Sequence, residues 1–210
     1  MIVEEPFKEP MISKLFIGGY KELQQYVMEM RDGILDFEVR KGNWKYTYHN
    51  RMVEYPIDNQ IDFPDEWYKN QFIFVLDELK RNPDSRRAVI DIRDNSEDMY
   101  SDDPACLQHI QFFIRDNKLH MKVLFRSNDA CKATFMNAFA LIMIQKMIAD
   151  SLGVDVGTYT HRANSFHCYE KDFKMLEGYV NRIHDYKDDW KDMMEECIPE
   201  ILKNVEKLKG

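Results

Sequence analysis

The chain has 210 residues, of which 44% are hydrophobic and 31% charged, and its formal net charge is -8. This length and apolar content can bury one sizeable core, so we expect a single domain over residues 1–210. The acidic balance argues against nucleic acid as the main partner. No stretch has the pattern of a signal peptide or a membrane span, and the 4 cysteines lack a CxxC pair, which favours a cytoplasmic protein away from the membrane.

Periodicity predicts two helices and a strand in the first half of the chain. A short helix is expected over 21–30 and a longer one over 63–85, which has Pro64 and two acids near its start. The longer helix has an apolar stripe formed by Phe72, Leu76 and Leu79. The segment RRAVIDIRD, residues 86–94, then predicts a strand.

A β-hairpin is the clearest element of the sequence. The segments LQHIQFFIRD and KLHMKVLFR flank Asp116-Asn117, which fits a two-residue turn. Apolar and polar residues alternate in the second segment, so one face should be buried. The aromatic density of the hairpin (Phe112, Phe113 and Phe125) suits packing of a sheet between subunits.

The remaining elements indicate the fold class. Residues 133–152 predict a helix that is apolar nearly all round and lies in the middle of the domain, with Gly153 as its C-cap. The segment 156–170 is expected to be extended, and two charged helical stretches end the chain. This order predicts an α+β fold with a mixed, largely antiparallel sheet packed against helices.

The segment FRSNDA at 125–130 contains four consecutive polar residues, from Arg126 to Asp129. They interrupt the apolar pattern between the hairpin and the central helix. A turn would account for Asn128 and Asp129, but not for an arginine at the end of a buried strand. Because an unpaired buried guanidinium costs several kcal/mol, Arg126 is expected to have an anion as partner. The sequence leaves open whether that anion belongs to the protein or to a ligand.

Several other polar residues stand out, and each alone has an ordinary structural interpretation. Cys106 at a strand start is most often a small core residue. Asn137 is often a structural hydrogen-bonder, the His167/Tyr169 pair is more often packing, and the Arg86-Arg87 pair is usually solvated.

Together these residue types fit one reaction. Arginines with the hydroxyl of Ser127 form a phosphate clamp. The amide of Asn137 can donate and accept at once, as reading a pyrimidine edge requires, and His167 and Tyr169 could hold sugar hydroxyls. A Cys106 thiolate, favoured by a nearby arginine, would add to C6 of a uracil ring and turn C5 into a carbon nucleophile.

The order and spacing of these residues resemble those of a known family. DPACLQHIQFFIRDNKLHMKVLFRSNDA resembles the Pro-Cys and Arg-Ser-x-Asp segments of thymidylate synthases, with Arg126 twenty residues after Cys106. The resemblance continues through Asn137 to HCY at 167–169 and backwards to NPDSRR at 82–87. It spans roughly 46–169 and looks most like the short thymidylate synthases of methanogenic archaea.

The resemblance implies a thymidylate synthase-like homodimer that associates through its sheet and binds a pyrimidine nucleoside monophosphate. Cys106 would be the nucleophile that adds to C6. Arg126 and Ser127 would hold the phosphate, and Arg86 and Arg87 would reach it from the other subunit. Adjacent strand residues point to opposite faces, so the last pair needs a bend to meet one phosphate.

The resemblance also assigns the base, the sugar and the one-carbon donor. Asn137 would read the uracil edge, while His167 and Tyr169 would hold the deoxyribose. Asp129 would contact the pterin of methylene-tetrahydrofolate or methylene-tetrahydromethanopterin. Of the two tyrosines in YTYH, Tyr48 is favoured for proton transfer at C5.

The sequence departs from the family at the donor site. It lacks the Arg-Thr-Gly-Thr phosphate loop and the tryptophan-rich segment with a catalytic glutamate, although Glu22 or Glu29 could replace that carboxylate. KATFMN stands where the family commonly has Leu-Gly-x-Pro-Phe-Asn, and a charged helix replaces the short apolar tail. The nucleotide site therefore has more support than the donor site.

Three activities remain open at this point: methylation of dUMP at C5, hydroxymethylation of dUMP, dCMP or CMP, and nucleotide binding without catalysis. Asn137 favours uracil, because relatives that act on cytosine tend to carry aspartate there. Cys106 argues against binding alone, which needs no thiol. Metal catalysis is disfavoured, because Cys106 and His109 lack a second pair of ligands.

Overall fold

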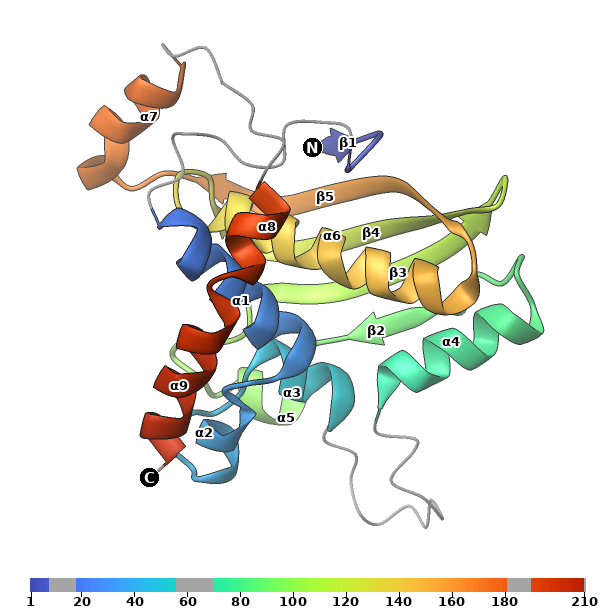
Figure 1. Cartoon of the computed structure of the whole chain (residues 1–210), viewed down its shortest axis with the longest axis horizontal. Helices are drawn as coiled ribbons and strands as arrows, with labels where there is room; N and C mark the ends of the chain where they lie inside the picture. Colours follow the sequence, from blue (N-terminus) through green and yellow to red (C-terminus); the bar gives the residue numbers. More distant parts are fainter. Residues whose placement is uncertain (8–17, 56–69, 181–189, 210) are drawn as a thin grey trace.

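The computed structural model describes residues 1–7, 18–55, 70–180 and 190–209, and their strands form one five-stranded sheet (Figure 1). Its order is β1-β5-β4-β3-β2; β4 and β5 run parallel and the other neighbours antiparallel. The predicted mixed, largely antiparallel sheet is confirmed. The strands are β1 (Ile2–Val3), β2 (Val89–Asp91), β3 (Leu107–Arg115), β4 (Lys118–Asp129) and β5 (Asp155–His167).

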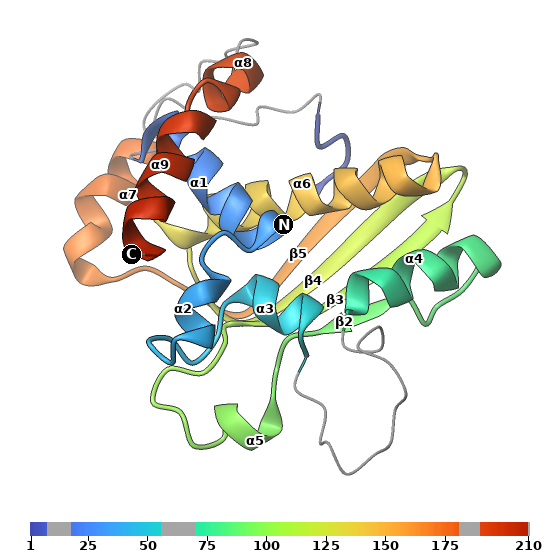
Figure 2. The same cartoon turned by 60° about the horizontal axis from the view of Figure 1, so that its bottom comes forward.

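Helices α4 and α6 lie along the same side of this sheet, and α1 packs on α6 (Figures 1 and 2). A short 3-10 turn, Glu170–Asp172, precedes the C-terminal helices. The described helices are α1 (Gly19–Asp32), α2 (Asp36–Arg40), α3 (Tyr48–Val53), α4 (Gln71–Arg81), α5 (Asn95–Asp98), α6 (Ala133–Leu152), α7 (Phe173–Val180), α8 (Trp190–Glu195) and α9 (Ile198–Lys209).

The predicted hairpin is confirmed as β3 and β4. Asp116 and Asn117 have φ of 50° and 57°, the left-handed values that a type I′ turn requires at both central residues. The strand continues past Arg126, however, so Asn128 and Asp129 belong to β4 and not to a turn. The polar segment is therefore held in the sheet beside β5.

The central helix α6 is apolar nearly all round because it lies between the sheet and α1. It ends at Gly153, whose φ of 69° fits the predicted C-cap. Among the described helices it has the length and composition to cross a membrane, but more than half of it is buried inside the domain. Phe112 and Phe125 are also fully buried in this core, so the proposal that they pack between subunits is wrong.

Several element boundaries differ from the predictions. Helix α4 begins at Gln71, because the Asn70 side chain accepts the first free N–H groups; residues 63–69, with Pro64, lie outside the described residues. The strand predicted over 86–94 is limited to Val89–Asp91. The described residues of the C-terminal part contain three helices where two were expected.

The sheet face away from α6 is only partly covered. Along β4 the residues that alternate with the buried ones, such as Lys122 and Leu124, are exposed or half-buried. Phe113 of β3 lies on this face, where the Lys122 ammonium sits 5.3 Å from the centre of its ring.

Candidate functional site

Cys106 immediately precedes β3 and is held in place by the neighbouring end of β4. The backbone N–H of Arg126 donates to the Cys106 carbonyl at 2.8 Å. The Arg126 side chain donates from Nε to the carbonyl of Ala105 at 3.1 Å and from Nη2 to that of Pro104 at 2.6 Å. The guanidinium thus fastens the loop that carries the cysteine.

These bonds show which partners Arg126 has in place of the anion that the sequence predicts. The side chain is half-buried, and its partners in the described part of the chain are two neutral carbonyls, with no carboxylate at ion-pair distance. A guanidinium has further N–H groups, and one whole nitrogen, Nη1, is not used in these bonds. The described residues therefore leave the charge of Arg126 available to an anionic ligand.

Tyr48 approaches Cys106 from the start of α3. Thr47 caps this helix by accepting the Asn50 N–H at 2.9 Å, which fixes the first turn. The Tyr48 hydroxyl accepts the N–H of Leu107 at 3.3 Å, and burial raises its pKa to about 12. Tyr48 therefore keeps its proton at neutral pH, and its hydroxyl contacts the residue that follows Cys106.

Asn137 is 5% exposed on α6, and its side chain meets a tyrosine that the sequence analysis did not single out. The hydroxyl of Tyr26, on α1, donates to Asn137 Oδ1. Burial raises the pKa of Tyr26 well above its ordinary value, and Tyr48 and Cys106 are among the groups close enough to act on it. No spacing motif links these positions, because α1 reaches α6 only through helix packing.

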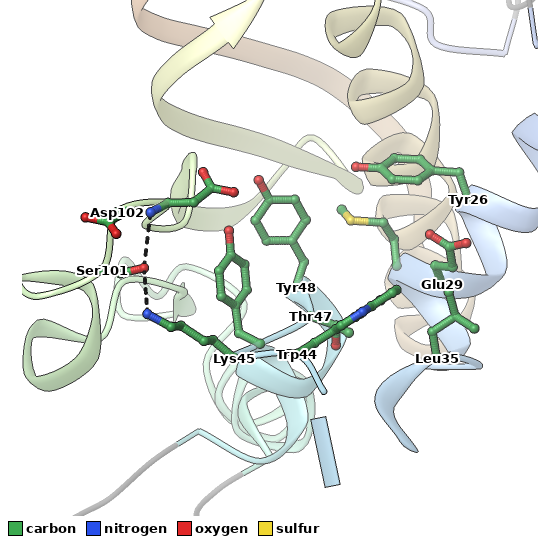
Figure 3. A pocket seen from close by; sticks show the side chains of 12 residues that line it. Tyr26, Glu29, Leu35, Trp44, Lys45, Thr47, Tyr48, Ser101 and Asp102 are labelled. Atoms are coloured by element: carbon green, nitrogen blue, oxygen red, sulfur yellow. Dashed lines mark hydrogen bonds between the residues drawn. The ribbon is translucent and has the colours of Figure 1, made fainter. Parts of the chain in front are cut away.

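A cavity of about 550 Å³ opens beside these groups (Figure 3). Its aromatic walls come from α1 on one side and from the segment before α3 on the other, and its acidic lining includes residues of the loop before Cys106. The aromatic residues are Tyr26, Trp44, Tyr46 and Tyr48, and the carboxylates are Glu29, Asp102 and Asp103. The cavity thus combines flat apolar surfaces with hydrogen-bond acceptors.

The structure separates the two glutamates that the sequence left as candidates. Glu29 lines the cavity, and burial raises its pKa, although Gln25 Nε2 donates to its Oε1 at 2.9 Å. Glu22 is exposed and does not line this cavity. Of these two glutamates, Glu29 is therefore the one positioned to exchange a proton in the cavity.

The expected sugar-binding residue His167 ends β5, beside Ser127 of β4, which was expected to hold the phosphate. Ser127 Oγ and His167 Nδ1 are 3.3 Å apart, within hydrogen-bond distance. Tyr169 lies beyond the end of β5 and is 53% exposed, but its ring remains 5.1 Å from that of His167. Asp129 accepts backbone N–H groups of the turn before α6, at 2.8 Å from Cys131, and is not part of the cavity wall.

Arg86 and Arg87 are not brought to this site within the chain. The N–H of Phe112 donates to the Ala88 carbonyl, so both arginines lie toward the far end of β3 from Cys106. About seven strand residues separate the two places, or roughly 23 Å at ~3.3 Å per residue. Arg86 is exposed.

The Arg87 side chain is 70% exposed and forms an ion pair with Glu78 of α4 at 2.9 Å. The Ser85 hydroxyl, Arg81 and Arg87 lower the pKa of Glu78 to about 2. Of the arginines that the sequence grouped as one clamp, the structure thus places Arg126 alone beside Cys106.

Comparisons with known proteins show the family of the chain. Residues 19–191 match the family model described as thymidylate synthase. The chain is 38% identical over 170 residues to a protein of Methanocaldococcus jannaschii named "Putative thymidylate synthase", covering 77% of this chain and 69% of that protein. A protein of the same name from Methanosarcina barkeri is 28% identical over 186 residues, or 88% of this chain and 77% of that protein.

The fold is also similar to that of a solved structure. The thermostable thymidylate synthase A from Bacillus subtilis superposes with a TM-score of 0.68 at 20% sequence identity, over 89% of this chain and 70% of that one.

Proposed function

Because the chain belongs to the thymidylate synthase family, we propose that it transfers a one-carbon unit to C5 of dUMP and reduces it to the methyl group of dTMP. The observation that carries this proposal is the attachment of the Pro104-Ala105-Cys106 loop to Arg126. The loop that carries the thiol is thereby bonded to a cation that lacks an anionic partner among the described residues. A nucleotide phosphate would supply that anion.

The nucleotide binds with its phosphate on Arg126 and Ser127, and with its sugar near His167 and Tyr169. The Cys106 thiolate forms a bond to C6, and the electron pair of the C5=C6 double bond moves toward O4. An N–H of Asn137 donates to O4 and stabilises the negative charge that develops there. C5 thereby becomes the nucleophile.

Later steps restore the C5=C6 double bond. C5 forms a bond to the methylene carbon of the donor and loses its proton as the bond between that carbon and the pterin nitrogen breaks. The hydride supplied by the donor then completes the methyl group, and the Cys106–C6 bond breaks so that its electron pair returns to the thiolate. The Tyr48 hydroxyl, protonated at neutral pH, relays the C5 proton: its oxygen accepts this proton as its own passes on. Glu29, whose pKa is raised in the same cavity, is the final acceptor.

The cavity fits the donor that this reaction needs. Its volume of about 550 Å³ lies in the range of ligand sites. Trp44 and Tyr46 offer faces for a flat pterin ring, and Asp102 and Asp103 accept its N–H groups. The same carboxylates would repel a phosphate, which supports Arg126 as the proposed phosphate ligand.

Methylene-tetrahydrofolate and methylene-tetrahydromethanopterin share this ring, and either supplies the one-carbon unit and the hydride when bound. Asp129, predicted to contact the pterin, holds a backbone turn in the chain alone, and its contact with the donor stays a prediction.

We further propose a cytoplasmic homodimer of single-domain subunits, 1–210, that associate through the sheet face carrying Phe113 and Lys122. Arg86 and Arg87 cannot reach Cys106 of their own chain, so a second subunit is the route by which they would reach a phosphate. For Arg87 this requires release from Glu78, whose buried carboxylate would keep Ser85 and Arg81 as partners.

Product analysis by mass spectrometry tests the reaction. The protein is incubated with dUMP, dCMP, UMP or CMP together with each methylene-pterin donor. A 5-methyl product from dUMP supports the proposal. A 5-hydroxymethyl product would assign the chain to the pyrimidine hydroxymethylases, in which water replaces hydride. Tight nucleotide binding without any product would indicate a binding protein.

A further inference from the structure

Tyr26 connects the cavity with the side chain that is expected to read the base. It reaches from α1 to α6, where its hydroxyl donates to Asn137 Oδ1, while its ring lines the cavity. In Figure 3 its hydroxyl end points across the cavity toward the side of Tyr48. The same tyrosine thus contacts both the reaction space and the buried amide.

The direction of this hydrogen bond determines how the amide is turned. Because burial keeps Tyr26 protonated, its hydroxyl is a lasting donor, and the Asn137 atom that faces it is the acceptor Oδ1. Asn137 Nδ2 has no hydrogen bond to a described residue, and it is not one of the fully buried unpartnered atoms. Within the described part of the chain, the amide N–H groups are therefore available to a ligand.

We infer that Tyr26 is a positioning residue that sets the base preference, by holding Asn137 with its N–H groups toward the pyrimidine. This inference rests on the proposed function, and it concerns the substrate choice of that site. At C4 uracil has a carbonyl, which accepts from this amide, whereas cytosine has an amino group, which would meet a second donor. A freely turning amide could offer its oxygen to cytosine instead.

The alternative is that the bond only fastens α1 to α6. Loss of a purely structural hydrogen bond would weaken the binding of both nucleotides by the same factor. Loss of a positioning contact changes the ratio of the two affinities. The ratio therefore separates the two roles even if the variant is somewhat less stable.

The test is a titration of dUMP and dCMP against the full-length protein, its Tyr26→Phe variant and a Tyr55→Phe control. Tyr55 also loses a hydroxyl, one that donates to the Arg93 carbonyl at 2.7 Å and lies outside the cavity. The preference for dUMP should fall by ~10-fold or more in Tyr26→Phe, as expected for losing a fixed donor, and remain unchanged in the control.

A double variant shows whether the effect passes through Asn137. In an Asn137→Asp background there is no amide to orient, so adding Tyr26→Phe should leave the preference unchanged. If Tyr26→Phe does not fold, Tyr26→Leu also removes the hydroxyl and serves in its place.

Two outcomes would overturn the inference. A wild-type protein that prefers dUMP, with an unchanged ratio in folded Tyr26→Phe, overturns the role of Tyr26 but leaves the proposed function intact. A wild-type protein that binds neither nucleotide overturns both.

Discussion

Replacing Arg126 by lysine would keep the charge at the site but remove the forked geometry that the structure uses. Arg126 spans two acceptors, the carbonyls of Ala105 at 3.1 Å and Pro104 at 2.6 Å, and leaves Nη1 for a ligand. A lysine ammonium is one compact donor on a flexible stem, so it cannot hold both carbonyls and a phosphate at once. We expect weaker phosphate binding together with a looser Cys106 loop.

The magnitude follows from the bonds that are lost. A hydrogen bond to a charged group contributes about 1.5–3 kcal/mol, or roughly 10- to 150-fold in affinity. Because Arg126 is half-buried and water can replace part of the contact, the lower half of this range is expected. The looser loop should lower the turnover number as well, since a nucleophile must be held near its target to react.

The assay compares the dissociation constants of dUMP and deoxyuridine, which differ only in the phosphate. The ratio isolates the phosphate contact and should shrink by roughly 10-fold or more in Arg126→Lys. Arg115→Lys is the matched control, because Arg115 is exposed at the distant hairpin tip. If folded Arg126→Lys keeps the wild-type ratio, the phosphate is bound elsewhere and the reasoning from the unpaired guanidinium is wrong.

Three further predictions concern the base, the subunits and the fold. Asn137→Asp should weaken the binding of dUMP and strengthen that of dCMP by roughly 1–3 kcal/mol in a binding titration, because an acceptor then meets the amino group. An unchanged preference between the two nucleotides would show that Asn137 does not read the base. Mixing Cys106→Ala with the double variant Arg86→Ala/Arg87→Ala should restore activity after subunit exchange, and no recovery despite proven exchange would place the phosphate clamp within one chain. Burial lowers the pKa of His161 to about 4, so the unfolded chain binds its proton first and the free energy of unfolding should fall by up to about 3 kcal/mol from pH ~6.5 to ~4. Denaturant titrations of His161→Gln should show a flatter profile over this range, and an equally steep one would refute this assignment.

The elements that the sequence predicted correctly have local signals. The turn of the hairpin needs two residues that tolerate positive φ, and Asp116-Asn117 provides them next to alternating strands. The apolar composition of α6 and the glycine at its C-cap, Gly153, predict this helix from the sequence. The end of β4 was misjudged because polar residues usually mark a turn, whereas here β5 pairs with them from far along the chain.

The candidate site shows the same division between local and distant signals. Cys106 and Arg126 are joined by a hairpin of fixed register, so their spacing predicts their proximity. Tyr26 and Glu29 reach the site through the packing of α1 on α6, for which no short motif exists. The cavity draws its walls from three separate segments, and its aromatic and acidic character becomes visible only in the folded chain.

The central claim, that Cys106 adds to the ring and makes C5 react, is tested most directly with dUMP that carries tritium at C5. Substitution at C5 must release this hydrogen, and the release depends on prior addition of the thiolate at C6. With a methylene-pterin donor, the wild-type protein should release tritium to water in step with product, and folded Cys106→Ala should release none while binding dUMP within a few fold of wild type. Product formed without tritium release, or release that persists in Cys106→Ala, would contradict the account.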